Sequence, residues 1–255
     1  MLSIQHLAKD SGRIDTILFD LDDTLIKVNE LFRIPLAIYT SLRFRNYFSP
    51  LMFPRIFLEA VEEIKRNKGE DTNFSVFTEY LALHSSLGES GKQELIEVIQ
   101  ASQREDLPKI ARYFSPYPGA SRSLELAKEK KIRLVLATNP VFPLEVVEFR
   151  MRCGGIDPHL FEFISHSQNM SRCKPDPEYY AEVIKKASVD PSHALMIGND
   201  PRNDLPAREL GIRTLILNSR LSRLRIWRLK PRGSFYFGTH EGLQALIEGI
   251  PVQEG

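Results

Sequence analysis

The sequence predicts an α/β fold, in which a parallel sheet carries helices on both faces and an all-helical insertion follows the first strand. Two patterns in the 255 residues lead to this expectation. After residue 118, segments with helical spacing alternate with short apolar runs, which is the rhythm of a parallel sheet. Between residues 28 and 115, apolar residues recur at helical spacing and no convincing strand is present.

The first strand is expected at residues 16–19, a short apolar run that ends in the polar cluster 20–24. The insertion that follows is expected to contain four or five helices, including residues 55–64, 74–84 and 94–99. Asp71 or Thr72 is expected to cap the second of these helices, and Ser90 the third, because short polar side chains accept hydrogen bonds from free N–H groups.

Residues 115–119 form a Pro- and Gly-rich breaker, after which the chain returns to the sheet. Four helices are expected after it, at residues 121–130, 144–153, 177–187 and 205–210. Each leads to a strand, at residues 132–137, 161–164, 194–197 and 214–217 respectively. A last strand at 235–237 and a closing helix at 241–248 complete a core of residues 1–27 and 116–255, with residues 28–115 as a separate domain.

Composition excludes several classes of protein. The chain has 34 Lys and Arg against 33 Asp and Glu, a formal net charge of +1, and 42% of its residues are hydrophobic. These values are ordinary for a globular protein, exclude a disordered chain, and give no reason to expect a nucleic-acid partner. Two cysteines, Cys153 and Cys173, are too few for a disulfide framework or a four-thiolate zinc site.

The N-terminus lacks the pattern of a secretory signal, and no apolar run reaches the ~18 residues of a membrane span. The sequence therefore predicts a cytoplasmic protein without an integral membrane segment.

Polar side chains follow three of the expected strands. They are residues 20–24, the pair Thr138-Asn139, and residues 198–200. Ligands of parallel sheets bind outside the carboxyl ends of the strands, so we expect these groups to meet at one edge.

Several carboxylates are expected at this edge. Asp20 and Asp22 are two residues apart and point the same way in extended backbone, and Asp200 and Asp204 are four apart. Converging carboxylates repel one another unless a cation lies among them, and hard oxygen ligands suit Mg²⁺. The alternative is a set of helix caps and turn residues.

Phosphate-binding groups are also present. Thr138 and Asn139 offer a hydroxyl, an amide and backbone N–H groups to a phosphate oxygen. Lys174, before the rigid turn 175–177, supplies a cation that neutralises a carboxylate and a phosphoryl group together. Taken alone, Thr138 and Asn139 are typical of a turn, and Lys174 is typical of a solvated residue before the start of a helix.

The four segments in this order closely resemble the motifs of the haloacid dehalogenase (HAD) superfamily. They are residues 19–25, 137–139, 174–177, and 197–200 with Asp204, and residues 117–120 look like that family's return from cap to core. The resemblance extends over about residues 13 to 218. It implies a Rossmann-like core with a helical cap inserted after the first motif.

The resemblance also implies roles for individual residues. Asp20 would be the nucleophile that forms an aspartyl-phosphate, and Asp22 the general acid and base. Thr138 and Asn139 would hold the phosphoryl oxygens, and Lys174 would stabilise the negative charge. Mg²⁺ would be held by the Asp20 side chain, the Asp22 backbone carbonyl and the fourth motif.

The fourth motif departs from the family pattern, which is Gly-Asp. Here Gly198 is followed by Asn199 and then Asp200. An alignment without a gap makes the Asn199 amide a metal ligand and places Asp204 next to the ligands, without a bond to the metal. If the motif is aligned one residue later, Asp200 is the ligand. We favour this alignment, because a negatively charged carboxylate attracts Mg²⁺ more strongly than an amide does.

Asp22 helps to choose the reaction, because relatives that cleave carbon–halogen or carbon–phosphorus bonds lack an acid at that position. The resemblance therefore favours a phosphatase acting on a small phosphorylated metabolite. A phosphomutase and a non-catalytic binding protein that kept the fold are the alternatives. Either a monomer or a homodimer is compatible with the sequence.

The insertion and the tail leave further alternatives. Asn29 and Arg33 are candidates for substrate specificity, or a solvated first helical turn. The aromatic residues of the insertion form a helical core, a dimer face or a pocket for an apolar substrate tail. The basic residues between Arg220 and Arg232 form an amphipathic surface segment or contact an anionic partner.

Overall fold

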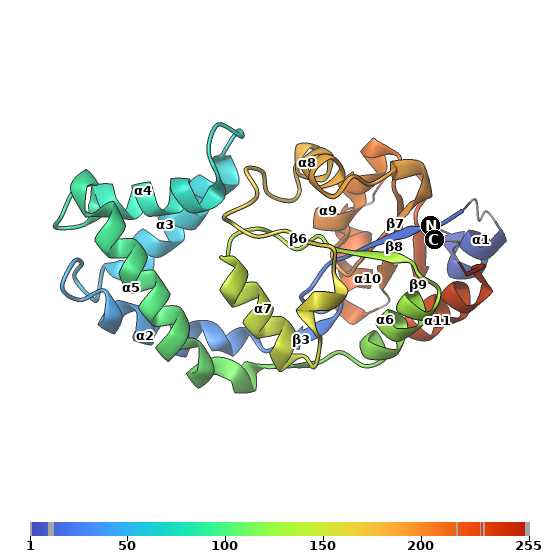
Figure 1. The fold of residues 1–255 in the computed structure, drawn as a ribbon, viewed down its shortest axis with the longest axis horizontal. Coiled ribbons are helices and arrows are strands. Elements are labelled where there is room, and N and C mark those ends of the chain that lie inside the picture. The colour runs from blue at the N-terminus through green and yellow to red at the C-terminus, as the bar shows by residue number, and fades with distance from the viewer. Residues whose placement is uncertain (1, 10–12, 218, 230, 232, 253–255) are drawn as a thin grey trace.

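A seven-stranded parallel sheet forms the centre of the protein, and the predicted α/β fold is confirmed (Figure 1). The structure is a computed structural model that describes residues 2–9, 13–217, 219–229, 231 and 233–252. Within these residues the sheet has the order β1-β9-β8-β7-β2-β5-β6. The strands are β1 (Leu2–Ser3), β2 (Thr16–Phe19), β5 (Arg133–Leu136), β6 (Phe163–Ile164), β7 (Ala194–Gly198), β8 (Arg213–Leu217) and β9 (Tyr236–Gly238).

Strand β2 lies between β5 and β7, and all four of its residues are buried. In the ladder Phe19 is opposite both Leu136 and Ile197, so the three strands end together. The residues that follow them are therefore brought to one edge of the sheet, as the sequence predicts.

Successive side chains of a strand point to opposite faces of the sheet, and an apolar cluster covers each face. Ile17 and Phe19 belong to one apolar cluster, and Leu18, between them, belongs to a second cluster with Tyr179 and Tyr180 of α8. The core helices are α1 (Ile4–Lys9), α6 (Ala120–Glu129), α7 (Leu144–Cys153), α8 (Pro177–Ala187), α9 (Pro201–Asp204), α10 (Arg220–Leu229) and α11 (His240–Gly249). Short 3-10 turns are η4 (Pro158–Leu160), η5 (Pro191–His193) and η6 (Leu205–Leu210).

The insertion lies to one side of the sheet (Figure 1). Its elements are η1 (Glu30–Phe32), α2 (Arg33–Arg43), α3 (Phe53–Arg66), α4 (Asn73–His84), η2 (Glu89–Gly91), α5 (Lys92–Glu105) and η3 (Leu107–Tyr113). It has an apolar cluster of its own, in which the rings of Phe44 and Phe53 stack with centroids 4.6 Å apart. Thr72 caps α4 by accepting a hydrogen bond from Ser75 N, as expected.

Several local expectations are wrong. The insertion is not helical throughout, because its two ends pair as antiparallel strands β3 (Ile26–Val28) and β4 (Phe114–Pro116). Strands of three residues are too short to give a periodic signal. Ser90 does not cap α5, since it lies in η2 and its hydroxyl donates to Leu87 O. Residues 205–210 form a 3-10 helix, with α9 before it.

At one edge of the sheet β1 pairs with β9 (Leu2 opposite Tyr236), a pairing that the sequence did not predict. The basic segment forms α10, while Lys230 and Arg232 lie outside the described residues. Among the helices described, none has the length and apolar character that crossing a bilayer requires.

The central strands should dominate stability. Leu195 of β7 is fully buried, whereas Leu51 in the insertion is 92% exposed. We expect Leu195→Ala to lower the free energy of unfolding by about 2–5 kcal/mol, since it leaves a cavity in the close-packed core. Leu51→Ala should change it by no more than about 0.5 kcal/mol. Urea denaturation of both variants measures the difference; equal losses would contradict the placement of the core.

Candidate active site

The carboxyl ends of three neighbouring strands place the predicted motifs together. Asp20 follows β2, and its N–H donates to the Ile197 carbonyl of β7 over 2.8 Å. Thr138 and Asn139 follow β5, and Asn199 follows β7. Rigid sheet backbone therefore sets where each of these residues leaves the core.

Lys174 joins two carboxylates at this edge. Its ammonium Nζ lies 2.9 Å from Asp20 Oδ1 and 2.8 Å from Asp204 Oδ1. The side chains of Lys174 and Asp204 are each 1% exposed and that of Asp20 is 13% exposed. The rings of Tyr179 and Tyr180 lie about the same cation, 5.9 and 5.8 Å from Nζ. The motifs containing Asp20, Lys174 and Asp204 thus form one buried ionic cluster.

Burial and charge act in opposite directions on this cluster. Burial raises the pKa of Asp20 to about 7, although the Lys174 charge lowers it; the charges of Asp204 and Asp22 add to the rise. Burial by itself lowers the pKa of Lys174, but Asp20 and Asp204 outweigh it and hold that pKa well above its ordinary value. Lys174 therefore stays protonated, and its single positive charge is shared between the carboxylates of Asp20 and Asp204.

Asp204 reaches Lys174 because residue 198 is glycine. A Cβ at position 198 would lie 2.1 Å from Asp204 Oδ2, closer than any side chain allows. The same Oδ2 accepts a hydrogen bond from Asp200 N over 2.9 Å. The glycine of the fourth motif therefore makes room for the carboxylate that holds Lys174.

Asp200 has other partners. Its carboxylate caps α9 by accepting from Arg202 N, accepts from Asn203 Nδ2, and pairs with Arg225 over 3.1 Å. These contacts occupy the Asp200 carboxylate, and they favour the alignment without a gap, in which Asn199 would be the metal ligand.

The loop after β5 is held from behind. Ser165 Oγ and Tyr179 OH donate to the Thr138 carbonyl over 2.8 and 2.7 Å. Asn139 Oδ1 is buried and has no hydrogen-bond partner among the described residues. Sequence reasoning missed Ser165 and Tyr179, since a serine after a strand and a tyrosine on an apolar helix face look like ordinary structural residues.

Arg150 of α7 is a second residue that sequence reasoning missed. Its guanidinium forms an ion pair with Asp22, and its side chain is 5% exposed while that of Asp22 is 48% exposed. The rings of Phe114 and Phe142 each lie 5.4 Å from the guanidinium carbon. The sequence does not distinguish it from Arg152 of the same helix, which pairs with Glu148 on the surface.

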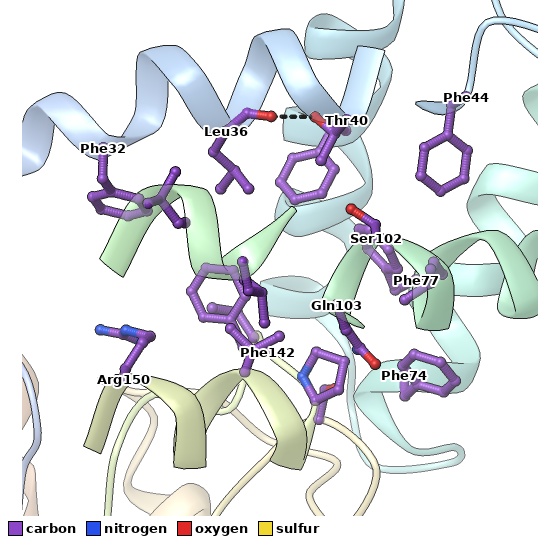
Figure 2. Close-up of a pocket in the computed structure, with 18 of the residues that line it drawn as sticks. Phe32, Leu36, Thr40, Phe44, Phe74, Phe77, Ser102, Gln103, Phe142 and Arg150 are labelled. Atoms are coloured by element: carbon purple, nitrogen blue, oxygen red, sulfur yellow. Dashed lines mark hydrogen bonds between the residues drawn. The ribbon is translucent and has the colours of Figure 1, made fainter. Parts of the chain in front are cut away.

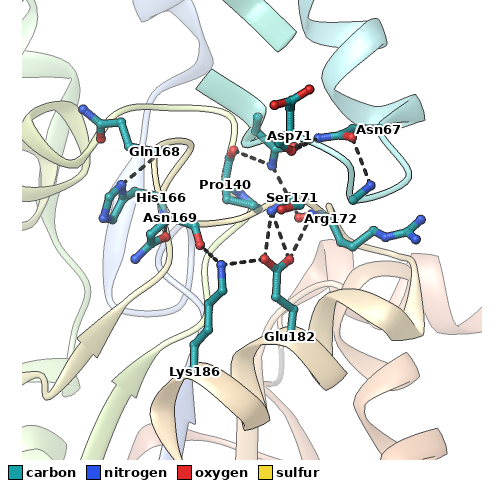
Figure 3. A network of polar contacts seen from close by, with 12 residues as sticks. Asn67, Asp71, Pro140, His166, Gln168, Asn169, Ser171, Arg172, Glu182 and Lys186 are labelled. Atoms are coloured by element: carbon teal, nitrogen blue, oxygen red, sulfur yellow. Dashed lines mark hydrogen bonds and ion pairs between the residues drawn. The ribbon is translucent and has the colours of Figure 1, made fainter. Parts of the chain in front are cut away.

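The insertion also contacts the core near Asn67 and Asp71, which lie close to Pro140 and Arg172 (Figure 3). Asn73, at the start of α4, is fully buried, and its Nδ2 donates to the carbonyls of Pro140 and Arg172 over 3.2 and 3.4 Å. Its own N–H donates to the Met170 carbonyl over 2.8 Å. The first turn of α4 therefore rests on the two loops that carry Asn139 and Lys174.

Asn29 and Arg33 are not brought to the cluster. Asn29 Oδ1 accepts from Leu31 N, and the Arg33 guanidinium, 72% exposed, pairs with Glu30. Their contacts are those of a capped, solvated helical turn.

The donor atoms fit a hard cation. No group of three or more His, Cys, Asp or Glu side chains in the described ranges is arranged to hold a metal. A site built from one carboxylate, a backbone carbonyl and an amide oxygen does not require such a group. Mg²⁺ commonly keeps several waters and takes few protein ligands, and a cation beside Asp20 would offset the burial and the Asp204 charge that oppose its ionisation.

Comparison with known proteins gives a consistent result. The family model described as haloacid dehalogenase-like hydrolase matches residues 14–210. The chain is 29% identical over 207 residues to a glyceraldehyde 3-phosphate phosphatase of Pyrococcus abyssi, covering 79% of this chain and 80% of that protein. It is 24% identical over 205 residues to the pyrophosphatase PpaX of Bacillus pumilus, covering 80% and 83%.

A solved structure of a HAD phosphatase from Thermococcus onnurineus shares the fold. It matches with a TM-score of 0.55 at 19% identity, covering 94% of this chain and 100% of that one.

His240 of α11 links the chain beyond Asp20 to the rest of the core. Its Nε2 lies 2.9 Å from the Thr24 carbonyl and its Nδ1 lies 3.0 Å from Ser123 Oγ. Burial lowers the pKa of His240, and the bond to Thr24 and the charge of Glu241 only partly oppose this. The unfolded chain therefore binds a proton that the folded protein does not.

This difference makes stability depend on pH. The contribution of His240 to the free energy of unfolding should fall as the pH drops below about 6.5, the ordinary histidine value, whereas Asp20, whose pKa is raised to about 7, contributes in the opposite direction over the same range. We expect the free energy of unfolding of His240→Gln, relative to that of wild type, to be higher at pH 5 than at pH 7, measured by urea denaturation at each pH. His84→Gln, an exposed control on α4, should keep the wild-type slope. A His240→Gln curve parallel to wild type would exclude His240 as the source.

Proposed function

Because this chain belongs to the haloacid dehalogenase-like hydrolases, we propose that it is a Mg²⁺-dependent phosphatase that hydrolyses a small phosphomonoester through an aspartyl-phosphate on Asp20. The observation that carries the proposal is the buried contact of Lys174 with Asp20 and Asp204. Asp22, which is more exposed, follows Asp20 by two residues. This arrangement combines a nucleophile, a fixed cation and an accessible acid.

In the first half-reaction, a carboxylate oxygen of Asp20 attacks phosphorus and the bond between phosphorus and the ester oxygen breaks. The leaving oxygen takes a proton from Asp22, whose partial exposure lets it reach the substrate. Lys174 stabilises the charge on the phosphoryl group, and Thr138 and Asn139 donate to its oxygens. Covalent catalysis replaces one difficult displacement by two easier ones.

In the second half-reaction, Asp22, now ionised, takes a proton from water while the water oxygen attacks the same phosphorus. The bond from phosphorus to Asp20 breaks and phosphate leaves. Arg150 holds the Asp22 carboxylate against the core and so limits the positions from which it acts.

Bound Mg²⁺ would supply charge neutralisation for the phosphoryl oxygens. The Asp20 side chain, the Asp22 backbone carbonyl and the Asn199 amide would hold it. Asp204 would act from behind, through Lys174.

We assign residues 28–115 to a cap and residues 1–27 and 116–255 to the core. Support comes from the strand pair β3 and β4, through which the chain enters and leaves the insertion. Contacts of Asn73 with both catalytic loops then correspond to a cap seated on the core. A cap in this place limits the substrate to a small metabolite, and we place its hydrolysis in the cytoplasm, by a monomer or homodimer.

Replacing Asp20 by Asn tests the mechanism. We expect phosphate release from a panel of small phosphate esters to fall by at least about a thousandfold, because the amide is not a nucleophile. Asp15→Asn is the matched control, since Asp15 lies at the opposite end of the same strand. Assays with Mg²⁺ and with chelator measure the metal requirement. Undiminished turnover by Asp20→Asn would refute the mechanism.

A second pair of variants tests the metal ligands. Asn199→Ala should raise the Mg²⁺ concentration for half-maximal activity by about tenfold or more, because it removes an oxygen donor. Asp200→Asn should leave this concentration nearly unchanged, since Asp200 already binds α9 and Arg225. The reverse order of effects would make Asp200 the ligand.

A further inference from the structure

A large apolar pocket lies between the insertion and α7 (Figure 2). Its cavity volume is about 90 Å³, several times the space that one water molecule requires. Its walls are almost entirely apolar, and include Phe32, Leu36, Phe44, Phe77 and Phe142. Such a volume is unusual between well-packed elements, where voids larger than a water molecule are few.

Polar side chains line the pocket on both sides (Figure 2): Arg150 and Ser167 on the core side, and Thr40, Ser102 and Gln103 on the insertion side. Arg150 Nε and Ser167 Oγ are buried without a hydrogen-bond partner among the described residues, and both residues line the pocket on its core side. Figure 2 shows Arg150 at one end and Phe44 and Phe77 toward the other. Unsatisfied buried polar atoms cost free energy unless a ligand or water pairs with them.

The core side of the pocket is linked to the candidate active site through Arg150. Arg150 forms the ion pair with Asp22, the proposed general acid. Val141 and Phe142, which also line the pocket, come two and three residues after Asn139 in the chain. An ester whose phosphate lies at Asp20 would therefore direct its organic group past Arg150 into the pocket.

We propose that the substrate is an amphiphilic phosphomonoester, whose phosphate is joined through a short polar link to an apolar hydrocarbon or aromatic group bound in this pocket. The inference rests on the proposed phosphatase function and specifies its substrate class. Arg150 and Ser167 bind the polar link, and the phenylalanine walls bind the apolar group.

The enclosure of the pocket favours a small molecule over a partner protein. The insertion contacts the core both at β3 and β4 and through Asn73 of α4, and the pocket lies between helices of the insertion and residues of α7. A helix of another chain would have to separate these contacts, whereas a hydrocarbon tail would not.

A series of n-alkyl phosphates tests the proposal. Ethyl, butyl, hexyl and octyl phosphate differ only in apolar length, and glycerol phosphate is a polar comparison. We expect kcat/KM to rise by roughly fourfold for each methylene that enters the pocket, until the pocket is full. Glycerol phosphate should react no faster than ethyl phosphate.

Two variants on one helix separate the pocket from the fold. Leu36→Asn places an amide in the apolar wall and should lower kcat/KM for octyl phosphate by about tenfold or more, leaving ethyl phosphate unchanged. Ile38→Asn, on the exposed side of α2, is the matched control and should behave as wild type. Calorimetric binding of octylphosphonate, which has no cleavable ester bond, supplies a measurement independent of turnover.

The outcomes are distinct. A rising series that Leu36→Asn flattens supports the apolar substrate class. Turnover without chain-length dependence overturns it and leaves the phosphatase function standing. Octylphosphonate binding that Leu36→Asn weakens, with no ester hydrolysed, keeps the apolar site and refutes the phosphatase. Absence of both binding and turnover overturns both proposals.

Discussion

The contact of one buried ammonium with two buried carboxylates is the constraint on which the site depends. Lys174 lies within 3 Å of both Asp20 and Asp204, and all three side chains are removed from water. Breaking such a cluster leaves an uncompensated charge in the interior, which is strongly destabilising. The glycine at position 198 leaves the space that the Asp204 carboxylate of this cluster occupies.

The parallel sheet explains how residues far apart in the chain meet at this cluster. Strands β5, β2 and β7 end in register, so the next residue of each emerges at the same edge. The loops there are then fixed by hydrogen bonds to their carbonyls, as Ser165 and Tyr179 do for Thr138. The site is thus positioned by backbone geometry first and by side-chain contacts second.

The sequence predicted the sheet and the motif residues because each strand is a short apolar run followed at once by polar residues. It did not predict the pairs formed across long separations, such as Leu2 with Tyr236 or Ile26 with Pro116, since strands of two or three residues carry no period. It favoured Asp200 over Asn199 as a metal ligand on charge alone, because the ion pair of Asp200 with Arg225 depends on where Arg225 lies in space.

Arg150 illustrates the same limit at the level of chemistry. In the sequence it is one of two arginines on α7, and only the fold buries it between two phenyl rings beside Asp22. A guanidinium cannot lose its charge, so its burial requires a partner such as Asp22, and its Nε still lacks one among the described residues. One side chain thereby faces both the proposed acid and the pocket. In the proposed reaction, occupation of the pocket would therefore affect the placement of the acid, which would couple recognition of the organic group to the chemistry at phosphorus.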